Sequence, residues 1–136
     1  MPRLFVASAA FLALATCLAG NAPRAADAPD LAFPEARTDS WHGHQRHVFQ
    51  FQGHAAWVVV PRAPLPGHPW SWCMMFPDAF TQRCAAPQLL DAGFHHAYVD
   101  VGNSFGSPAA VATLAAFHDE LVRRGLAAKA ALIGIS

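Results

Sequence analysis

The spacing of apolar residues alternates between strand-like and helix-like over most of the chain. Strand-like runs occur at 47–51, 55–60, 70–76, 96–101 and 130–135, and helical spacing occurs at 80–92 and 108–124. The first two runs flank Gly53, which predicts a hairpin. Strands that then alternate with helices indicate parallel pairing through right-handed crossovers. The sequence predicts an α/β fold, an antiparallel hairpin followed by a parallel β-α-β-α-β unit.

Turn and cap residues set the expected limits of the two helices. Ser107 is a helix N-cap residue, Pro108 fits the first helical turn, and Gly125 follows the last one. Pro87 interrupts the earlier helical run, so we expect that helix to be short or kinked and to end near Gly93.

The N-terminus has the layout of a secretory signal peptide. Met1-Pro2-Arg3 is a short basic start, and an apolar run ending in small residues follows it to Gly20. We predict a signal peptide at 1–26, a linker at 27–40, a partial domain at 41–136, and export to the periplasm or medium. Lipid attachment at Cys17 is a less favoured variant. The alternative, a hydrophobic N-terminus on a cytosolic protein, leaves the apolar run unexplained.

Charge and composition narrow the classes of partner. The chain has 136 residues and a formal net charge of zero, so it has no basic stripe for nucleic acid. The N-terminal apolar run is short and rich in alanine, which argues against a stable membrane span. No Gly-x-Gly-x-x-Gly motif follows the first strand, so a nucleotide-binding domain is disfavoured. We expect no cofactor, and the oligomeric state stays open.

The last predicted strand runs into Gly134-Ile135-Ser136, the first half of a Gly-x-Ser-x-Gly nucleophile elbow. A serine hydroxyl is a weak nucleophile until a base removes its proton. A sharp turn after the strand would lift it to where a base can reach it. The pattern predicts Ser136 as a catalytic nucleophile.

Several segments together resemble a group of exported bacterial α/β-hydrolases related to the prolyl-oligopeptidase and esterase branch. They are Trp41-His42-Gly43, Trp57-Val58-Val59-Val60-Pro61, Pro69-Trp70-Ser71-Trp72, Gly93-Phe94-His95, Tyr98-Val99-Asp100-Val101, Phe105-Gly106-Ser107-Pro108 and Gly134-Ile135-Ser136. The resemblance covers residues 41–136. It implies the N-terminal half of an α/β-hydrolase fold and a small-molecule ester or related acyl substrate.

The resemblance also implies how the site would be completed. A backbone N–H just past the third strand would donate to the oxyanion, with Cys73 and Met74 as the candidates. The catalytic acid and base would follow Ser136 in the chain. We therefore expect the sequence to be the N-terminal fragment of a serine hydrolase, inactive by itself. A non-catalytic α/β binding module, or a degenerate hydrolase remnant, is the alternative.

Other polar residues suit structural roles better. Histidine is a common zinc ligand, and His42, His44 and His47 lie close together in the sequence. No cysteine or carboxylate nearby completes a set of four ligands. We therefore expect a solvated strand face and no metal. Asp100 and His118 are read as a loop-ordering carboxylate and a helix-edge side chain.

The cysteines and tryptophans leave alternatives open. Cys73 and Cys84 are either a disulfide, which an exported protein can keep, or two buried thiols. Trp70, Trp72, Phe76 and Phe80 are expected in the sheet core, with Trp72 or Phe76 on a pocket rim as the alternative.

Overall fold

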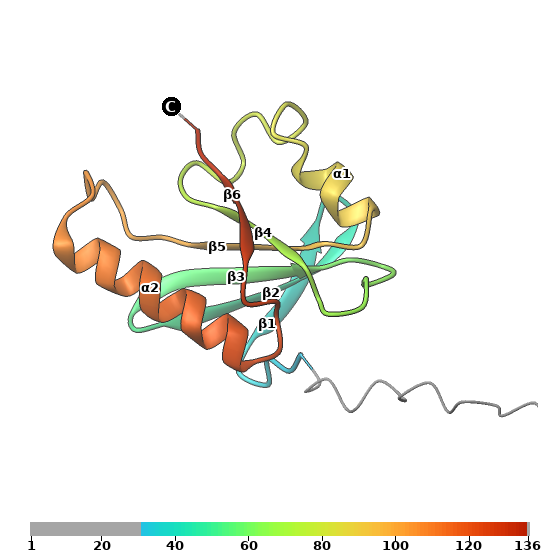
Figure 1. Cartoon of the computed structure of the whole chain (residues 1–136), viewed down its shortest axis with the longest axis horizontal. Coiled ribbons are helices and arrows are strands. Elements are labelled where there is room, and N and C mark those ends of the chain that lie inside the picture. The colour runs from blue at the N-terminus through green and yellow to red at the C-terminus, as the bar shows by residue number, and fades with distance from the viewer. Residues whose placement is uncertain (1–30, 136) are drawn as a thin grey trace, which may run out of the picture.

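The computed structural model describes residues 31–135, which form one sheet with a helix on each face (Figure 1). The predicted signal peptide and Ser136 lie outside these residues. The strands are β1 (Arg37–Trp41), β2 (His44–Phe51), β3 (His54–Val60), β4 (Trp70–Cys73), β5 (His95–Val99) and β6 (Ala130–Ile133), and the helices are α1 (Ala86–Asp91) and α2 (Pro108–Arg123).

The sheet is mixed, with the order β1-β2-β3-β5-β4-β6. β1, β2, β3 and β5 pair antiparallel in succession, whereas β4 pairs in parallel with β5 on one side and with β6 on the other. The strand at 130–133 is therefore a parallel neighbour of 70–73, as the sequence predicted. It is also an edge of the sheet.

The predicted fold class is wrong. A mixed six-stranded sheet with two short helices replaces the expected N-terminal half of an α/β-hydrolase fold with its alternating β-α-β units. Three of the five strand pairings are antiparallel. Strand residues outnumber helical residues for two reasons. β1 begins inside the predicted linker, and most of 80–92 forms turns rather than helix.

The short α1 has a local cause. Pro87 lies in its first turn, where a missing N–H and a fixed φ are tolerated, so the helix begins beside the proline instead of passing through it. At its other end, the Gly93 N–H donates to the Leu90 carbonyl oxygen. Gly93 has φ +94, and a Cβ there would lie 2.8 Å from the Ala63 carbonyl oxygen, so only glycine fits.

The longer helix α2 begins and ends as predicted. Ser107 is its N-cap residue, and its Oγ accepts a hydrogen bond from the Ala110 N–H at 3.4 Å. Pro108 occupies the first turn, and Gly125 follows the helix with φ +112. Local sequence alone is enough to fix both ends.

The two faces of the sheet hold separate apolar clusters. The larger cluster lies under α2 and contains Phe33, Phe49, Ala56, Val58, Trp70, Trp72, Ala97, Val99, Phe117, Leu121 and Leu126. The smaller lies under α1 and contains Trp41, Trp57, Val59, Ala86 and Leu90. Alternate residues of β3 thus enter opposite clusters, as expected for a strand covered on both faces.

Candidate functional site

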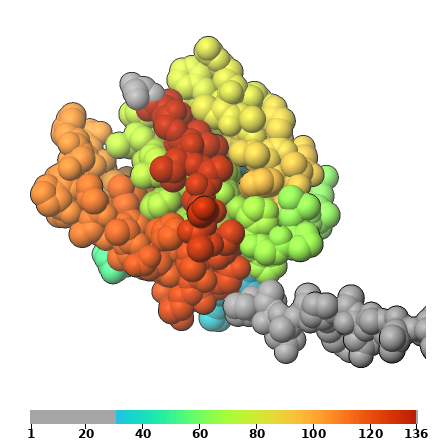
Figure 2. Space-filling view, viewed as in Figure 1, coloured from blue at the N-terminus to red at the C-terminus, as the bar shows by residue number. Residues whose placement is uncertain are grey.

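The end of β6 and the loop between β4 and α1 meet at one edge of the sheet. β4 and β6 run parallel, so their carboxyl ends lie together, and the Met74 N–H donates to the Ile133 carbonyl oxygen at 3.1 Å. Gly134 and Ile135 continue from β6, and Ser136 follows them outside the described residues. In Figure 2 this C-terminal segment lies at the surface, between α2 and the segment that leads to α1. Open sheets bind ligands at the carboxyl ends of parallel strands.

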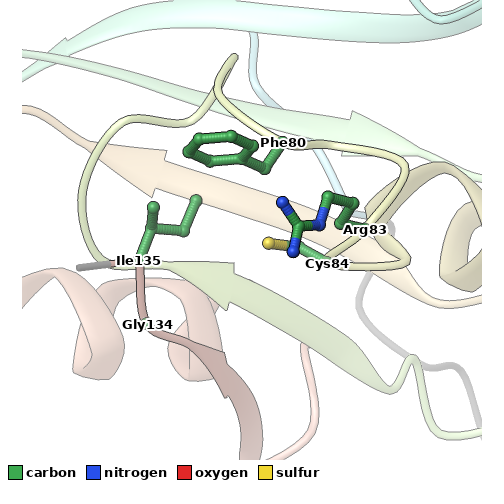
Figure 3. A pocket seen from close by; sticks show the side chains of 5 residues that line it. All are labelled: Phe80, Arg83, Cys84, Gly134 and Ile135. Carbon is green, nitrogen blue, oxygen red and sulfur yellow. The ribbon is translucent and has the colours of Figure 1, made fainter.

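A pocket of about 290 Å³ opens at this edge (Figure 3). It is lined by Phe80, Arg83 and Cys84 from the β4–α1 loop and by Gly134 and Ile135 from the segment after β6. The Arg83 guanidinium and the Cys84 sulfur point toward Ile135, beneath the Phe80 ring. The pocket thus has an apolar wall and a cationic end, next to the position predicted for the nucleophile.

The loop that forms one wall has an unusual backbone. Phe76, Phe80 and Ala85 have φ of 52°, 55° and 57°, a left-handed region that costs side-chain-bearing residues energy. Backbone hydrogen bonds from the N–H groups of Arg83 and Cys84 to the Phe80 carbonyl oxygen hold the turn. Strained backbone of this kind concentrates at functional sites.

A side-chain contact fixes the same loop to the sheet. The Trp41 Nε1–H, at the end of β1, donates to Asp78 Oδ1 at 2.9 Å. This bond ties the loop to β1, the edge strand opposite β6, and engages the carboxylate nearest in sequence to Arg83. Asp78 does not line the pocket.

Arg83 differs from the other arginines of residues 31–135. Arg37, Arg46, Arg123 and Arg124 each donate to a carboxylate, and Arg62 donates to the Gly43 carbonyl oxygen. Arg83 has no hydrogen-bond acceptor among the described residues. Its guanidinium carbon instead lies 5.6 Å from the centre of the Phe80 ring, a cation–π distance.

The two predicted oxyanion donors lie at the end of β4. The Met74 N–H is already engaged by the Ile133 carbonyl oxygen, so it is not available to a substrate in this structure. Cys73 is buried, and its thiol donates to the Met75 carbonyl oxygen at 3.1 Å. Burial raises the pKa of the Cys73 thiol, so the group stays protonated at neutral pH. Cys73 and Cys84 are both free thiols.

A buried serine and histidine pair lies deeper in the sheet. Ser71 Oγ, on β4, is 2.7 Å from His96 Nδ1, on β5, and both side chains are excluded from solvent. The His96 ring stacks on Trp41 at 5.2 Å, and burial lowers its pKa to about 4. Without solvent access this pair cannot meet a substrate. Sequence reasoning missed it, although parallel pairing of 70–73 with 95–99 would have placed Ser71 beside His96.

The remaining histidines take structural positions. His95 and His96 point to opposite faces of the sheet, since His95 contacts His68 while His96 contacts Trp41. The expected solvated face for His42, His44 and His47 is wrong for His44, which is 4% exposed and lies 3.1 Å from Asp91 of α1. Within 31–135 no group of three or more histidine, cysteine or acidic side chains is arranged to hold a metal ion.

Two predicted structural roles are confirmed and one is corrected. The Asp100 carboxylate accepts a hydrogen bond from the Gly102 N–H at 2.9 Å, so it orders the loop after β5. His118 lies at the edge of α2, with Nε2 3.1 Å from the Ala128 carbonyl oxygen. Phe76 and Phe80, both expected in the core, are 50% and 58% exposed, and Phe80 lines the pocket instead.

Comparison with protein-family models, curated proteins and solved structures finds no match for this chain. No helix in residues 31–135 is long and apolar enough to cross a membrane. The resemblance to exported hydrolases therefore stays a prediction from the sequence motifs. Function has to be argued from the geometry at the end of β6.

Proposed function

We propose that the protein is a serine hydrolase that uses Ser136 to attack a small ester or related acyl compound. The observation that carries the proposal is the position of Gly134 and Ile135. They continue from a strand in a parallel pair and line the pocket at its carboxyl end. Ser136 follows them directly, so the Gly-x-Ser sequence comes at a place where a ligand has room to bind.

The proposal assigns substrate binding to the pocket wall. Phe80 and Ile135 supply apolar surface for the acyl or alcohol group. Few polar groups on an otherwise apolar wall are typical of small-molecule sites. A backbone N–H near the end of β4 would stabilise the oxyanion. The Met74 N–H is engaged by the Ile133 carbonyl oxygen and Cys73 is part of the β4 ladder, so in this proposal one of the two N–H groups turns away from the sheet when substrate binds.

The proposal needs a base that the pocket does not supply. No histidine lines it, and the buried His96 is closed off from it. In this proposal the base and its acid partner belong to polypeptide that follows Ser136, in keeping with the order of the triad that the resemblance implies. Serine, base and acid are then brought together only when that polypeptide is present.

Covalent labelling tests this assignment. A fluorophosphonate probe reacts with a serine that an adjacent base activates, so an adduct reports the assembled site rather than a hydroxyl alone. The coding sequence is read past codon 136, and the protein with any continuation is labelled and mapped by mass spectrometry. We expect an adduct on Ser136 and none on Ser104 or Ser107.

The controls decide between hydrolase and binding module. Ser136→Ala should abolish both labelling and hydrolysis of a chromogenic short-chain ester. A folded protein that carries its continuation but shows no adduct on Ser136 would contradict the proposal. The pocket would then be that of a non-catalytic binding protein.

A further inference from the structure

We infer that the pocket beside Ile135 binds the carboxylate of a small apolar acid, and that Arg83 recognises the negative charge. The part of this inference that concerns substrate rests on the proposed function. It says that the substrates are esters that also carry a free carboxylate. The part that concerns binding stands on the pocket alone. Nothing in the proposed chemistry at Ser136 requires a charged substrate.

The positive charge in the pocket comes from Arg83. The guanidinium has no acceptor among residues 31–135, and no acidic side chain lines the pocket. Each of the other arginines in that range donates a hydrogen bond to an oxygen. A guanidinium offers a planar fork of donors that matches a carboxylate at two points. Arg83 is exposed, so its guanidinium is available to a carboxylate that enters the pocket.

The Phe80 ring and the turn from Phe80 to Arg83 position the guanidinium. The guanidinium lies over the Phe80 ring, and the hydrogen bonds from the Arg83 and Cys84 N–H groups to the Phe80 carbonyl oxygen close the turn that joins them. Stacking on an aromatic face reduces the number of side-chain conformers that a ligand must fix. Phe80 has a left-handed φ, and its ring lines the pocket.

Apolar side chains form much of the remaining wall of the pocket. Ile135 faces the guanidinium across the pocket, and Phe80 covers it (Figure 3). A ligand with a carboxylate at one end and an apolar body at the other satisfies both parts. A volume of about 290 Å³ is at the lower end for ligand sites, which favours a body of roughly one ring or a short branched chain.

The binding test uses a matched pair of probes. Benzoate and its neutral amide, benzamide, have nearly the same shape and differ in charge. Each is titrated into the whole chain carrying Ser136→Ala, and the amide resonances of Cys84 and Ile135 are followed by NMR. We expect benzoate to bind at least about fivefold more tightly than benzamide, because a hydrogen bond to a charged group outweighs a neutral one.

Variants assign the preference to one side chain. Arg83→Gln should remove the preference for benzoate, and Arg83→Lys should keep part of it. Arg62→Gln is the matched control, since Arg62 is also an exposed arginine in a loop but lies outside the pocket, and it should bind both probes like the parent. Equal affinities for the two probes, or a preference that survives Arg83→Gln, would overturn the inference. Tighter binding of inorganic phosphate than of benzoate would overturn the choice of a carboxylate.

A paired hydrolysis assay separates this inference from the proposed function. The protein that labels at Ser136 is assayed with the 4-nitrophenyl monoester of glutarate and with 4-nitrophenyl valerate, which lacks the free carboxylate. We expect a kcat/KM ratio that favours the charged ester and falls at least about fivefold in Arg83→Gln. Labelling at Ser136 without charge preference removes only the carboxylate inference. Benzoate binding through Arg83 without labelling removes only the hydrolase.

Discussion

The face of the sheet under α2 is packed almost entirely with apolar side chains, whereas the face under α1 buries Ser71, His44 and His96 among its aromatic residues. The α2 face is covered by a helix of 16 residues and the α1 face by one of 6. The loop that replaces the rest of α1 forms the pocket. From this difference we expect the thick apolar face to contribute more of the stability, while the loop on the thinly covered face leaves room for a ligand.

Truncating one residue on each face tests this contrast most strongly. Phe117 of α2 and Leu90 of α1 are both fully buried. We expect Phe117→Ala to lower the free energy of unfolding by about 4 kcal/mol and Leu90→Ala by about 3 kcal/mol, since the larger side chain leaves the larger cavity. Urea titration followed by tryptophan fluorescence measures both. A greater loss for Leu90→Ala would show that the α1 face carries more of the stability than its size suggests.

Acid should destabilise both faces through their buried histidines. Burial lowers the pKa of His95, on the α2 side and beside His68, and of His96, on the α1 side near His42, to about 4. The unfolded chain binds protons below about pH 6.5 while the folded chain does not. Stability is therefore complete above that pH and falls as pH drops from 6.5 toward 4.

The size of the acid effect follows from the same shift. At pH 5.5 we expect a loss of about 1 kcal/mol per histidine relative to pH 7.5, measured by urea titration at each pH. His96→Asn should reduce the pH dependence of the free energy of unfolding by the contribution of one histidine. A pH dependence unchanged in that variant would mean that His96 is not the neutral buried group described here.

Removing the Ser71 hydroxyl tests the polar pair on the α1 face. Ser71→Ala leaves His96 Nδ1 buried without its partner at 2.7 Å, and we expect a loss of about 1–3 kcal/mol. Thr113→Ala is the comparison, because that hydroxyl bonds only the Ala109 carbonyl oxygen on the surface of α2. Its effect should be within about 0.5 kcal/mol. Equal effects of the two substitutions would argue that the buried pair adds nothing.

A small change in stability is expected at the edge strand. Leu132 on β6 is 65% exposed, and β6 contains neither charge nor proline to discourage pairing with another chain. Leu132→Lys should alter stability by less than about 1 kcal/mol but reduce self-association, as seen by light scattering against concentration. At the other edge, β1 already carries Arg37 and Asp39, so Thr38→Lys should change association little.

Local sequence was a good guide wherever one element could be read without its neighbours. The hairpin around Gly53 and the limits of α2 were predicted, because turns, caps and apolar periods are short-range signals. The fold class was wrong because the number of antiparallel ladders depends on long-range pairing. The antiparallel pairing of β3 with β5 joins segments that β4 and α1 separate in the chain. β1 lies in a polar stretch without a strand-like apolar period, and its pairing is with β2 at the edge of the sheet.

The candidate site divides in the same way. The sequence by itself determined where a Gly-x-Ser follows an apolar strand. The oxyanion candidates Cys73 and Met74 came only from the resemblance to exported hydrolases and stay a prediction. Only the tertiary structure brought Phe80, Arg83 and Cys84 to Ile135, because 50 residues and two further strands separate these segments in the chain. It alone also showed that the Met74 N–H is engaged and that Ser71 meets His96. The spacing of apolar residues and the residues that form turns are visible in a short stretch of sequence. A pocket, by contrast, exists only where segments distant in the chain come together.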